Sequence, residues 1–275
     1  MKIDIKKKPI QELLNFSIIN IDKPSGPTSF SVSDFIRKSL NLNKTSHFGT
    51  LDPQCSGVLP VALGRACRLN DYFIHKDKIY VGIMRLHKDI SEEKLKEAMK
   101  NLTGKITQLP PVRSRVKRAL REREIKRFEI LERDKKDVLF IAEVQAGTYI
   151  RRLCDDVGKK IGGAHMLELR RIRASIFPEE ESITLYGFDK AVKEYKNGSD
   201  ALLRKILIPA DGAIKKVLPF IDEDIEKKLL NQILTGKPLM KGDLKKMPDE
   251  NVFALFSEEK FLISIFILII EYKSF

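Results

Sequence analysis

The strongest constraint on the fold is a change in hydrophobic spacing between residues 138 and 162. Apolar side chains first alternate along the chain, at Val138, Phe140, Ala142 and Val144. This period of two is typical of a strand with one buried face. The spacing then becomes helical, at Ile150, Leu153, Val157 and Ile161. Gly162 is suited to end that helix. A strand followed closely by an amphipathic helix predicts a domain in which helices pack on a sheet.

The same two patterns recur along the first 218 residues. Strands are predicted at 17–22 and 78–86, and helices at 31–40, with Ser31 as its cap, and from Ser91 onward. A domain boundary is expected near Pro219. Beyond it, the sequence predicts one helix at 222–235 and strands within 252–256 and 261–270. We therefore expect an α+β main domain followed by a small, mostly β module.

The charge balance indicates a polyanionic partner. The chain has 51 Lys and Arg residues against 38 Asp and Glu residues, a net charge of +13. Residues 113–127 hold eight basic side chains and two glutamates, and a second basic run covers 168–175. An excess of this size favours nucleic acid first and an acidic membrane surface second. A solvated charged face is the ordinary alternative for each run.

Several other classes of protein are disfavoured. The three cysteines form no CxxC pair and no Cys/His ligand set, so neither a disulfide framework nor a metal site is expected. The longest apolar run, 261–270, has ten residues and is too short to cross a bilayer. The N-terminal segment lacks a secretory signal pattern, and we expect a cytosolic protein.

One short segment concentrates unusual backbone chemistry around a single acid. Residues 46–60 read SHFGTLDPQCSGVLP and contain two glycines, two prolines and the lone carboxylate Asp52. Asp before Pro is a common turn former, which is the ordinary interpretation. A carboxylate that must stay ionised in a water-poor pocket needs a cation, and a guanidinium can hold it bidentately. Arg151 and Tyr80 would complete such a site, although each alone is more often a surface charge or a core aromatic.

Five segments, in this order, resemble the TruB-type RNA pseudouridine synthases, and most closely their dyskerin-like branch of archaea and eukaryotes. They are NIDKPSGPTS (20–29), HFGTLDPQCSGVLPVALG (47–64), KIYVGIMRLH (78–87), AGTYIRRLCDDVG (146–158) and GAHMLELRRIRAS (163–175). PIQELLN (9–15) and LPPVRSRVKR (109–118) resemble the dyskerin-like branch in particular. The resemblance covers about residues 9 to 218.

The resemblance implies a role for each candidate residue. Asp52 is the essential carboxylate, Arg151 pairs with it, and Tyr80 stacks on the flipped base and helps to remove its C5 proton. Whether the carboxylate attacks the ribose, adds to the base or abstracts a ribose proton stays open. The implied substrate-binding residues are His47, which fills the space left by the flipped nucleotide, Leu169 as an apolar wall, Gly49 and Thr50. The expected RNA-binding residues are Arg113, Arg115, Lys117, Arg118, Arg170 and Arg171. No metal or organic cofactor is implied.

The resemblance also implies an architecture: a mixed, mostly antiparallel pseudouridine synthase sheet flanked by helices over 12–218. A short or divergent PUA-like RNA-binding module is expected at 219–275, with an N-terminal extension, 1–11, packing on it. Phe48 stands where a small hydroxylic residue is common, and we expect it to narrow the loop or offer a stacking surface.

Three functions remain in competition. The first is the catalytic subunit of a box H/ACA particle, with guide RNA, substrate RNA and small accessory proteins as partners and without a membrane. The second is a stand-alone synthase acting on the tRNA T-loop, and the third is a non-catalytic RNA-binding scaffold. The expected location is the cytoplasm for an archaeal protein and the nucleolus for a eukaryotic one.

Overall fold

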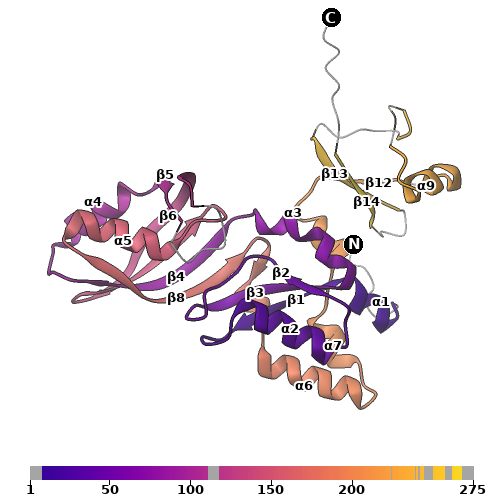
Figure 1. Ribbon diagram of the computed structural model, residues 1–275, viewed down its shortest axis with the longest axis horizontal. Helices are drawn as coiled ribbons and strands as arrows, with labels where there is room; N and C mark the ends of the chain where they lie inside the picture. Colours follow the sequence, from indigo (N-terminus) through magenta and orange to yellow (C-terminus); the bar gives the residue numbers. More distant parts are fainter. Residues whose placement is uncertain are drawn as a thin grey trace, which may run out of the picture.

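One long mixed sheet forms the body of the protein (Figure 1). The computed structural model describes residues 8–110, 118–223, 225–238, 240, 242–244, 250–257 and 262–267. In spatial order the main path of the sheet is β10 (Ile183–Thr184), β1 (Ser17–Lys23), β3 (Ser56–Leu63), β8 (Ala164–Ala174), β4 (Lys78–Leu86), β7 (Asp137–Val144), β6 (Arg121–Asp134) and β5 (Gly104–Gln108). Three short strands pair beside this path: β11 (Ile208–Pro209) with β1, β2 (Thr45–His47) with β3, and β9 (Phe177–Pro178) with β8.

The two halves of the sheet meet where β3 and β8 pair in parallel. Ser56 lies opposite Arg170 and Gly57 opposite Arg171. On its other side β8 pairs antiparallel with β4, and Tyr80 lies opposite Arg171. This junction therefore brings the segment that follows Asp52, the strand that carries Tyr80 and the second basic run side by side.

Helices flank the sheet in two groups (Figure 1). The helices before the C-terminal module are α1 (Ile10–Asn15), α2 (Ser29–Ser39), α3 (Asn70–Ile74), α4 (Glu92–Lys100), α5 (Ile150–Ile161), α6 (Leu185–Lys196), α7 (Ala201–Ile206) and α8 (Ala210–Ile214). The 3₁₀ helices are η1 (Gly64–Leu69) and η2 (Glu179–Glu181). Helices α4 and α5 lie at the β5–β7 end, whereas α2, α6 and α7 lie at the β1 end.

Most local predictions are confirmed, including the period change at 138–162. Strand β7 alternates buried and half-buried residues, and α5 ends at Gly162 in a left-handed conformation, φ 90°. Ser91 caps α4 by accepting a hydrogen bond from the Lys94 amide. The predicted cap of α2 is wrong. The helix begins two residues before Ser31, and Thr28 accepts the amide hydrogen of Ser31 instead.

Residues 168–175 differ more from expectation. The sequence predicted a basic surface run, but these residues belong to β8, in the middle of the sheet, with one end in the turn that follows it. Three arginines in this run masked the strand pattern, because burial there depends on neighbouring strands and not on side-chain charge.

Phe48 lies in the core. It is 1% exposed and stacks on Phe73 with ring centroids 4.7 Å apart, and Phe177 lies against both rings. The expectation that Phe48 offers a stacking surface is therefore wrong. The aromatic ring instead anchors the segment before Asp52 to the core.

Phe48→Ala is expected to lower the free energy of unfolding by about 3–5 kcal/mol, because it leaves a cavity in this cluster. Chemical denaturation measures the change. Phe30→Ala is the matched control: Phe30 is 68% exposed, so its removal should change the free energy by about 0.5 kcal/mol or less. Equal effects of the two substitutions would contradict the core assignment.

A second, smaller sheet follows the expected boundary. Its strands, in order, are β12 (Phe220–Asp222), β13 (Val252–Phe256) and β14 (Leu262–Ile267), and α9 (Lys227–Leu234) packs with them. Buried Asp211 links this sheet to the body, because it accepts the β14 amide of Leu262 and also binds Lys8. Within the described part of the chain, no helix has the length and apolar character needed to span a membrane.

Candidate active site

The Asp52 turn connects β2 to β3, at the junction of the two half-sheets. Gly49 has φ +108°, and the Cys55 amide donates to the Asp52 carbonyl at 3.0 Å, which closes the turn. At the end of the turn, β3 approaches β8 so closely that a Cβ atom on Gly57 would lie 2.2 Å from the Arg171 carbonyl oxygen. Glycine at position 57 is therefore required for the pairing that places the turn.

Arg151 meets Asp52 as predicted. It lies in the first turn of α5, 99 residues along the chain, and its Nη2 donates to Asp52 Oδ2. Both side chains remain about half exposed, at 48% for Arg151 and 55% for Asp52. The bidentate contact expected from the sequence is replaced by a single hydrogen bond. The carboxylate thus has a fixed cation on one side and remains open to a ligand on the other.

Beside this pair lies a cavity of about 430 Å³. Asp52, Gly49 and Thr50 line one side, and Tyr80 from β4 and Leu169 from β8 line another. Tyr80 and Leu169 are each 8% exposed and form an aromatic and an aliphatic wall. The volume falls in the range of small-ligand sites and admits a single nucleotide.

His47 lies at the edge of this arrangement, not in the wall of the cavity. Its Nε2 is 3.3 Å from Thr50 Oγ1, and Thr50 does line the cavity. Burial lowers the pKa of His47, and the nearby Arg171 guanidinium lowers it further. The imidazole is therefore biased toward its neutral form. Its role in filling the space of a flipped nucleotide stays a prediction.

Two buried lysines beside the turn were not singled out from the sequence. Lys23 donates to the carbonyls of Pro24, Pro27 and Pro53. Lys78 donates to the carbonyls of Ile74, the last residue of α3, and of Lys76 just beyond it, and burial lowers its pKa to about 8. Their positions in the sequence could have indicated these two lysines, because Lys23 ends β1 and Lys78 lies two residues before Tyr80.

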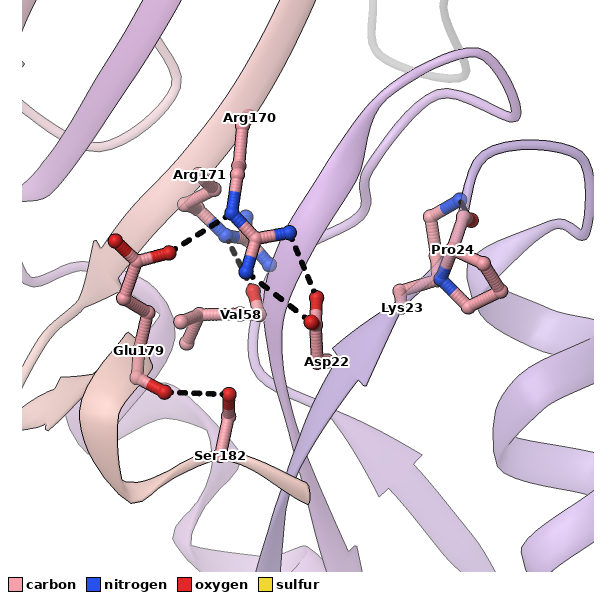
Figure 2. A network of polar contacts seen from close by, with 8 residues as sticks. All are labelled: Asp22, Lys23, Pro24, Val58, Arg170, Arg171, Glu179 and Ser182. Atoms are coloured by element: carbon pink, nitrogen blue, oxygen red, sulfur yellow. Dashed lines mark hydrogen bonds and ion pairs between the residues drawn. The ribbon is translucent and has the colours of Figure 1, made fainter. Parts of the chain in front are cut away.

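The six predicted RNA-binding residues have different outcomes. Arg113, Arg115 and Lys117 lie outside the described residues. Arg118 is exposed. Arg170 is held by the carboxylates of Asp22 and Glu179, and Arg171 is 1% exposed (Figure 2). Arg171 is therefore too buried to act as a surface phosphate contact, and its side chain lies in the wall of the cavity beside Asp52.

Within the described segments, no group of three or more His, Cys, Asp and Glu side chains is arranged to hold a metal ion.

Comparisons with known proteins agree with this geometry. The model of "TruB family pseudouridylate synthase (N terminal domain)" matches residues 37–150, and that of "tRNA pseudouridylate synthase B C-terminal domain" matches residues 151–215. The "Probable tRNA pseudouridine synthase B" of Methanothermobacter thermautotrophicus is 38% identical over 245 residues, which cover 88% of this chain and 75% of that protein. The chain belongs to the TruB family of pseudouridylate synthases.

Other TruB-family relatives are longer than the matched region. Proteins of the same name from Methanocaldococcus jannaschii and Pyrococcus abyssi are 41% and 46% identical, and the matches cover 79% and 76% of this chain. They cover 66% and 64% of those two relatives, slightly less than two thirds of each.

Solved structures of TruB-family relatives share the whole fold. A chain in the crystal structure of a Cbf5–Nop10–Gar1 complex matches with a TM-score of 0.83 and 39% identity, over 95% of this chain and 80% of that one. A chain of an H/ACA RNP bound to a substrate RNA containing 2′-deoxyuridine matches with a TM-score of 0.80 and 36% identity, over 95% of this chain and 80% of that one. The resemblance to the dyskerin-like branch and the predicted α+β architecture are confirmed.

Proposed function

We propose that this chain isomerises uridines in RNA to pseudouridine as the catalytic subunit of a guide-RNA particle of the box H/ACA type, with Asp52 as its essential carboxylate. The contact between Arg151 and Asp52 beside the cavity carries the proposal. Residues from three separate parts of the chain meet there, in an arrangement that a simple turn would not require.

The reaction breaks the N1–C1′ bond of a uridine, turns the base, and joins C5 to C1′. A proton then leaves C5, and N1 gains one. Asp52 acts on the nucleotide as an ionised carboxylate, which the Arg151 guanidinium stabilises. Tyr80 presents an aromatic face for stacking and a hydroxyl near the base, and Leu169 supplies an apolar wall.

A single carboxylate suits this chemistry. Glycosidases use two carboxyl groups, because a departing alcohol must be protonated and a water deprotonated. Pseudouridine formation releases no leaving group and consumes no water, so one acid suffices. In agreement with this, the group that faces Asp52 is the Arg151 guanidinium and not a second carboxylate.

Guide dependence is supported by the structural relatives. The two solved structures contain Cbf5 with Nop10 and Gar1, and an H/ACA RNP with its substrate RNA. Since this chain matches each over 95% of its length, we propose guide RNA, substrate RNA and small accessory proteins as its partners. The basic surface, with Arg118 exposed, provides the electrostatic attraction for RNA.

A stand-alone tRNA synthase is the second candidate, because the curated relatives are named tRNA pseudouridine synthase B. Mass-spectrometric mapping of pseudouridine separates the two. The purified protein is incubated with a tRNA transcript and with an rRNA fragment, each with and without guide RNA and accessory proteins. Guide-dependent modification supports the particle, whereas tRNA modification by the protein alone supports the second candidate. Absence of pseudouridine in every reaction would refute both.

Arg123 offers a specific test of RNA binding near the site. Its guanidinium lies against Gly147, which lines the cavity: a Cβ atom at Gly147 would be 3.1 Å from Arg123 Nη2. Its one described hydrogen bond is to the Glu122 carbonyl, so no described carboxylate neutralises it. Arg123→Ala is expected to weaken RNA binding about three- to tenfold and to reduce the salt slope of log K by about 1.

Fluorescence anisotropy at several salt concentrations measures both effects. Arg127→Ala is the matched control on the same strand, because Arg127 is exposed and already paired with Glu129. The control should change RNA affinity less than Arg123→Ala. An identical salt slope in the two variants would exclude a phosphate contact at Arg123.

A further inference from the structure

Two adjacent arginines on β8 make different kinds of contact (Figure 2). Arg170 lies between two carboxylates, with bonds to Asp22 at 2.9 and 3.1 Å and to Glu179 at 2.8 Å. Arg171 points toward β3, and it donates hydrogen bonds to backbone carbonyls. The first arginine ties strands together at a half-buried site, whereas the second is buried beside the Asp52 turn.

The contacts of Arg171 lie on either side of Asp52. Its Nε donates to the Val58 carbonyl at 2.7 Å, and its Nη2 donates to the Gly49 carbonyl at 3.0 Å. Gly49 precedes Asp52 in the turn, and Val58 follows it in β3. One rigid, planar guanidinium thus spans the base of the turn that carries the carboxylate.

Two other buried side chains hold the turn close to Asp52 itself. Ser29 Oγ accepts the Leu51 amide at 2.8 Å and donates to the Leu51 carbonyl at 2.9 Å. Lys23 donates to the Pro53 carbonyl at 3.2 Å. The residues directly before and after Asp52 are therefore fixed, and Arg171 fixes the two ends of the segment.

We propose that Arg171 is a positioning residue of the reaction: its guanidinium joins the Gly49 and Val58 carbonyls and so sets the direction in which the Asp52 carboxylate enters the cavity. This inference rests on the proposed function. Burying a cation is costly unless its donors are satisfied, so core packing alone gives no reason for arginine at this position. The need to bind two carbonyls at a fixed separation does explain why arginine stands there. An ammonium, being a point charge, cannot reproduce the separation and plane of a guanidinium.

The consequence is specific to the chemical step. Asp52 is joined to Arg151 by a single hydrogen bond and is about half exposed, so the turn largely determines the position of its carboxylate. A displacement of about 1 Å at a reacting group can cost about a hundredfold in rate. Arg171 lines the cavity but is only 1% exposed, so its replacement should leave the outer RNA-binding surface unchanged.

The test compares Arg171→Lys with Arg170→Lys, its neighbour on the same strand. Single-turnover pseudouridine formation is measured in the assembled complex, with RNA affinity and thermal unfolding measured in parallel. For Arg171→Lys we expect the rate constant to fall about 10- to 100-fold, with the final amplitude and the RNA Kd kept within about twofold. Arg170→Lys can retain an ion pair, and its rate should fall by about threefold or less.

The rate constant separates positioning from stability, because misfolded protein lowers the amplitude and not the rate constant of the folded fraction. An unchanged rate constant in Arg171→Lys would overturn the proposal. So would a Kd that rises in step with the loss of rate, since Arg171 would then contact RNA itself. If the lysine variant does not fold, Arg171→Gln replaces it and is held to the same outcomes.

A second test uses the wild-type protein and needs no variant. In nitrogen-15 NMR spectra of arginine side chains, the Arg171 Nε–H should exchange slowly with water, because it is buried and donates to Val58. Rapid exchange would overturn the inference. The wild-type complex could instead show slow Arg171 exchange but form no pseudouridine. That result would refute the proposed function and leave the contacts of Arg171 with the Gly49 and Val58 carbonyls intact.

Discussion

Asp52→Ala is expected to abolish pseudouridine formation, with a loss of at least about a thousandfold in the single-turnover rate constant. The substitution removes the carboxylate that binds Arg151 beside the cavity, and no other acidic residue lines that cavity in the described chain. RNA affinity should stay within about threefold, because a half-exposed carboxylate attracts no phosphate. Quantitative mass spectrometry of the RNA measures the first quantity, and anisotropy the second.

Asp34→Ala is the matched control. Asp34 lies on α2 and pairs with Arg37 and Lys38 at the surface, so its loss should leave the rate unchanged. The two variants should unfold at similar temperatures. Turnover at the wild-type rate in Asp52→Ala would contradict the assigned chemistry and favour a non-catalytic RNA scaffold.

Arg151→Lys is expected to lower the rate constant by about 100- to 1000-fold, with RNA affinity nearly unchanged. Lysine keeps the positive charge, but an ammonium is a compact point charge without the plane of a guanidinium. In the structure Arg151 binds Asp52 through one guanidinium nitrogen only. The orientation of the guanidinium plane is therefore set by the position of Arg151 on α5. Loss of that directionality lets the carboxylate rotate away from the reacting nucleotide.

Arg152→Lys tests whether the effect belongs to the site. Arg152 is the next residue of α5 and pairs with Asp156, outside the cavity. Its variant should turn over within about twofold of the wild type. Similar losses in both variants would show that α5 is merely disturbed, and normal turnover of Arg151→Lys would exclude the ion pair as a functional element.

Much of the architecture could be predicted because it depends on local patterns. The alternation at Val138–Val144 and the helical spacing after Ile150 each follow from which face of one element is apolar. The pairing of Asp52 with Arg151 was also predicted, although from a resemblance in motifs and not from spacing. Their separation of 99 residues has no local signal.

The failures share one cause. Arg171 was predicted to bind phosphate as part of a basic run, and Phe48 was predicted to narrow the loop or to offer a stacking surface. Each prediction assumed exposure, which is a property of the neighbours. Strands β3 and β4 pair with both edges of β8, and the aromatic cluster closes over Phe48.

The amino-acid sequence by itself determined the α+β class and the positions of the elements with a clear hydrophobic period, such as β7 and α5, because these depend on residue type and on spacing within short segments. Only the tertiary structure decided that Arg151 binds Asp52 through a single hydrogen bond, and that Arg171 lies beside the turn. Those outcomes depend on the parallel pairing of β3 with β8, which joins segments more than a hundred residues apart and leaves no periodic trace in either.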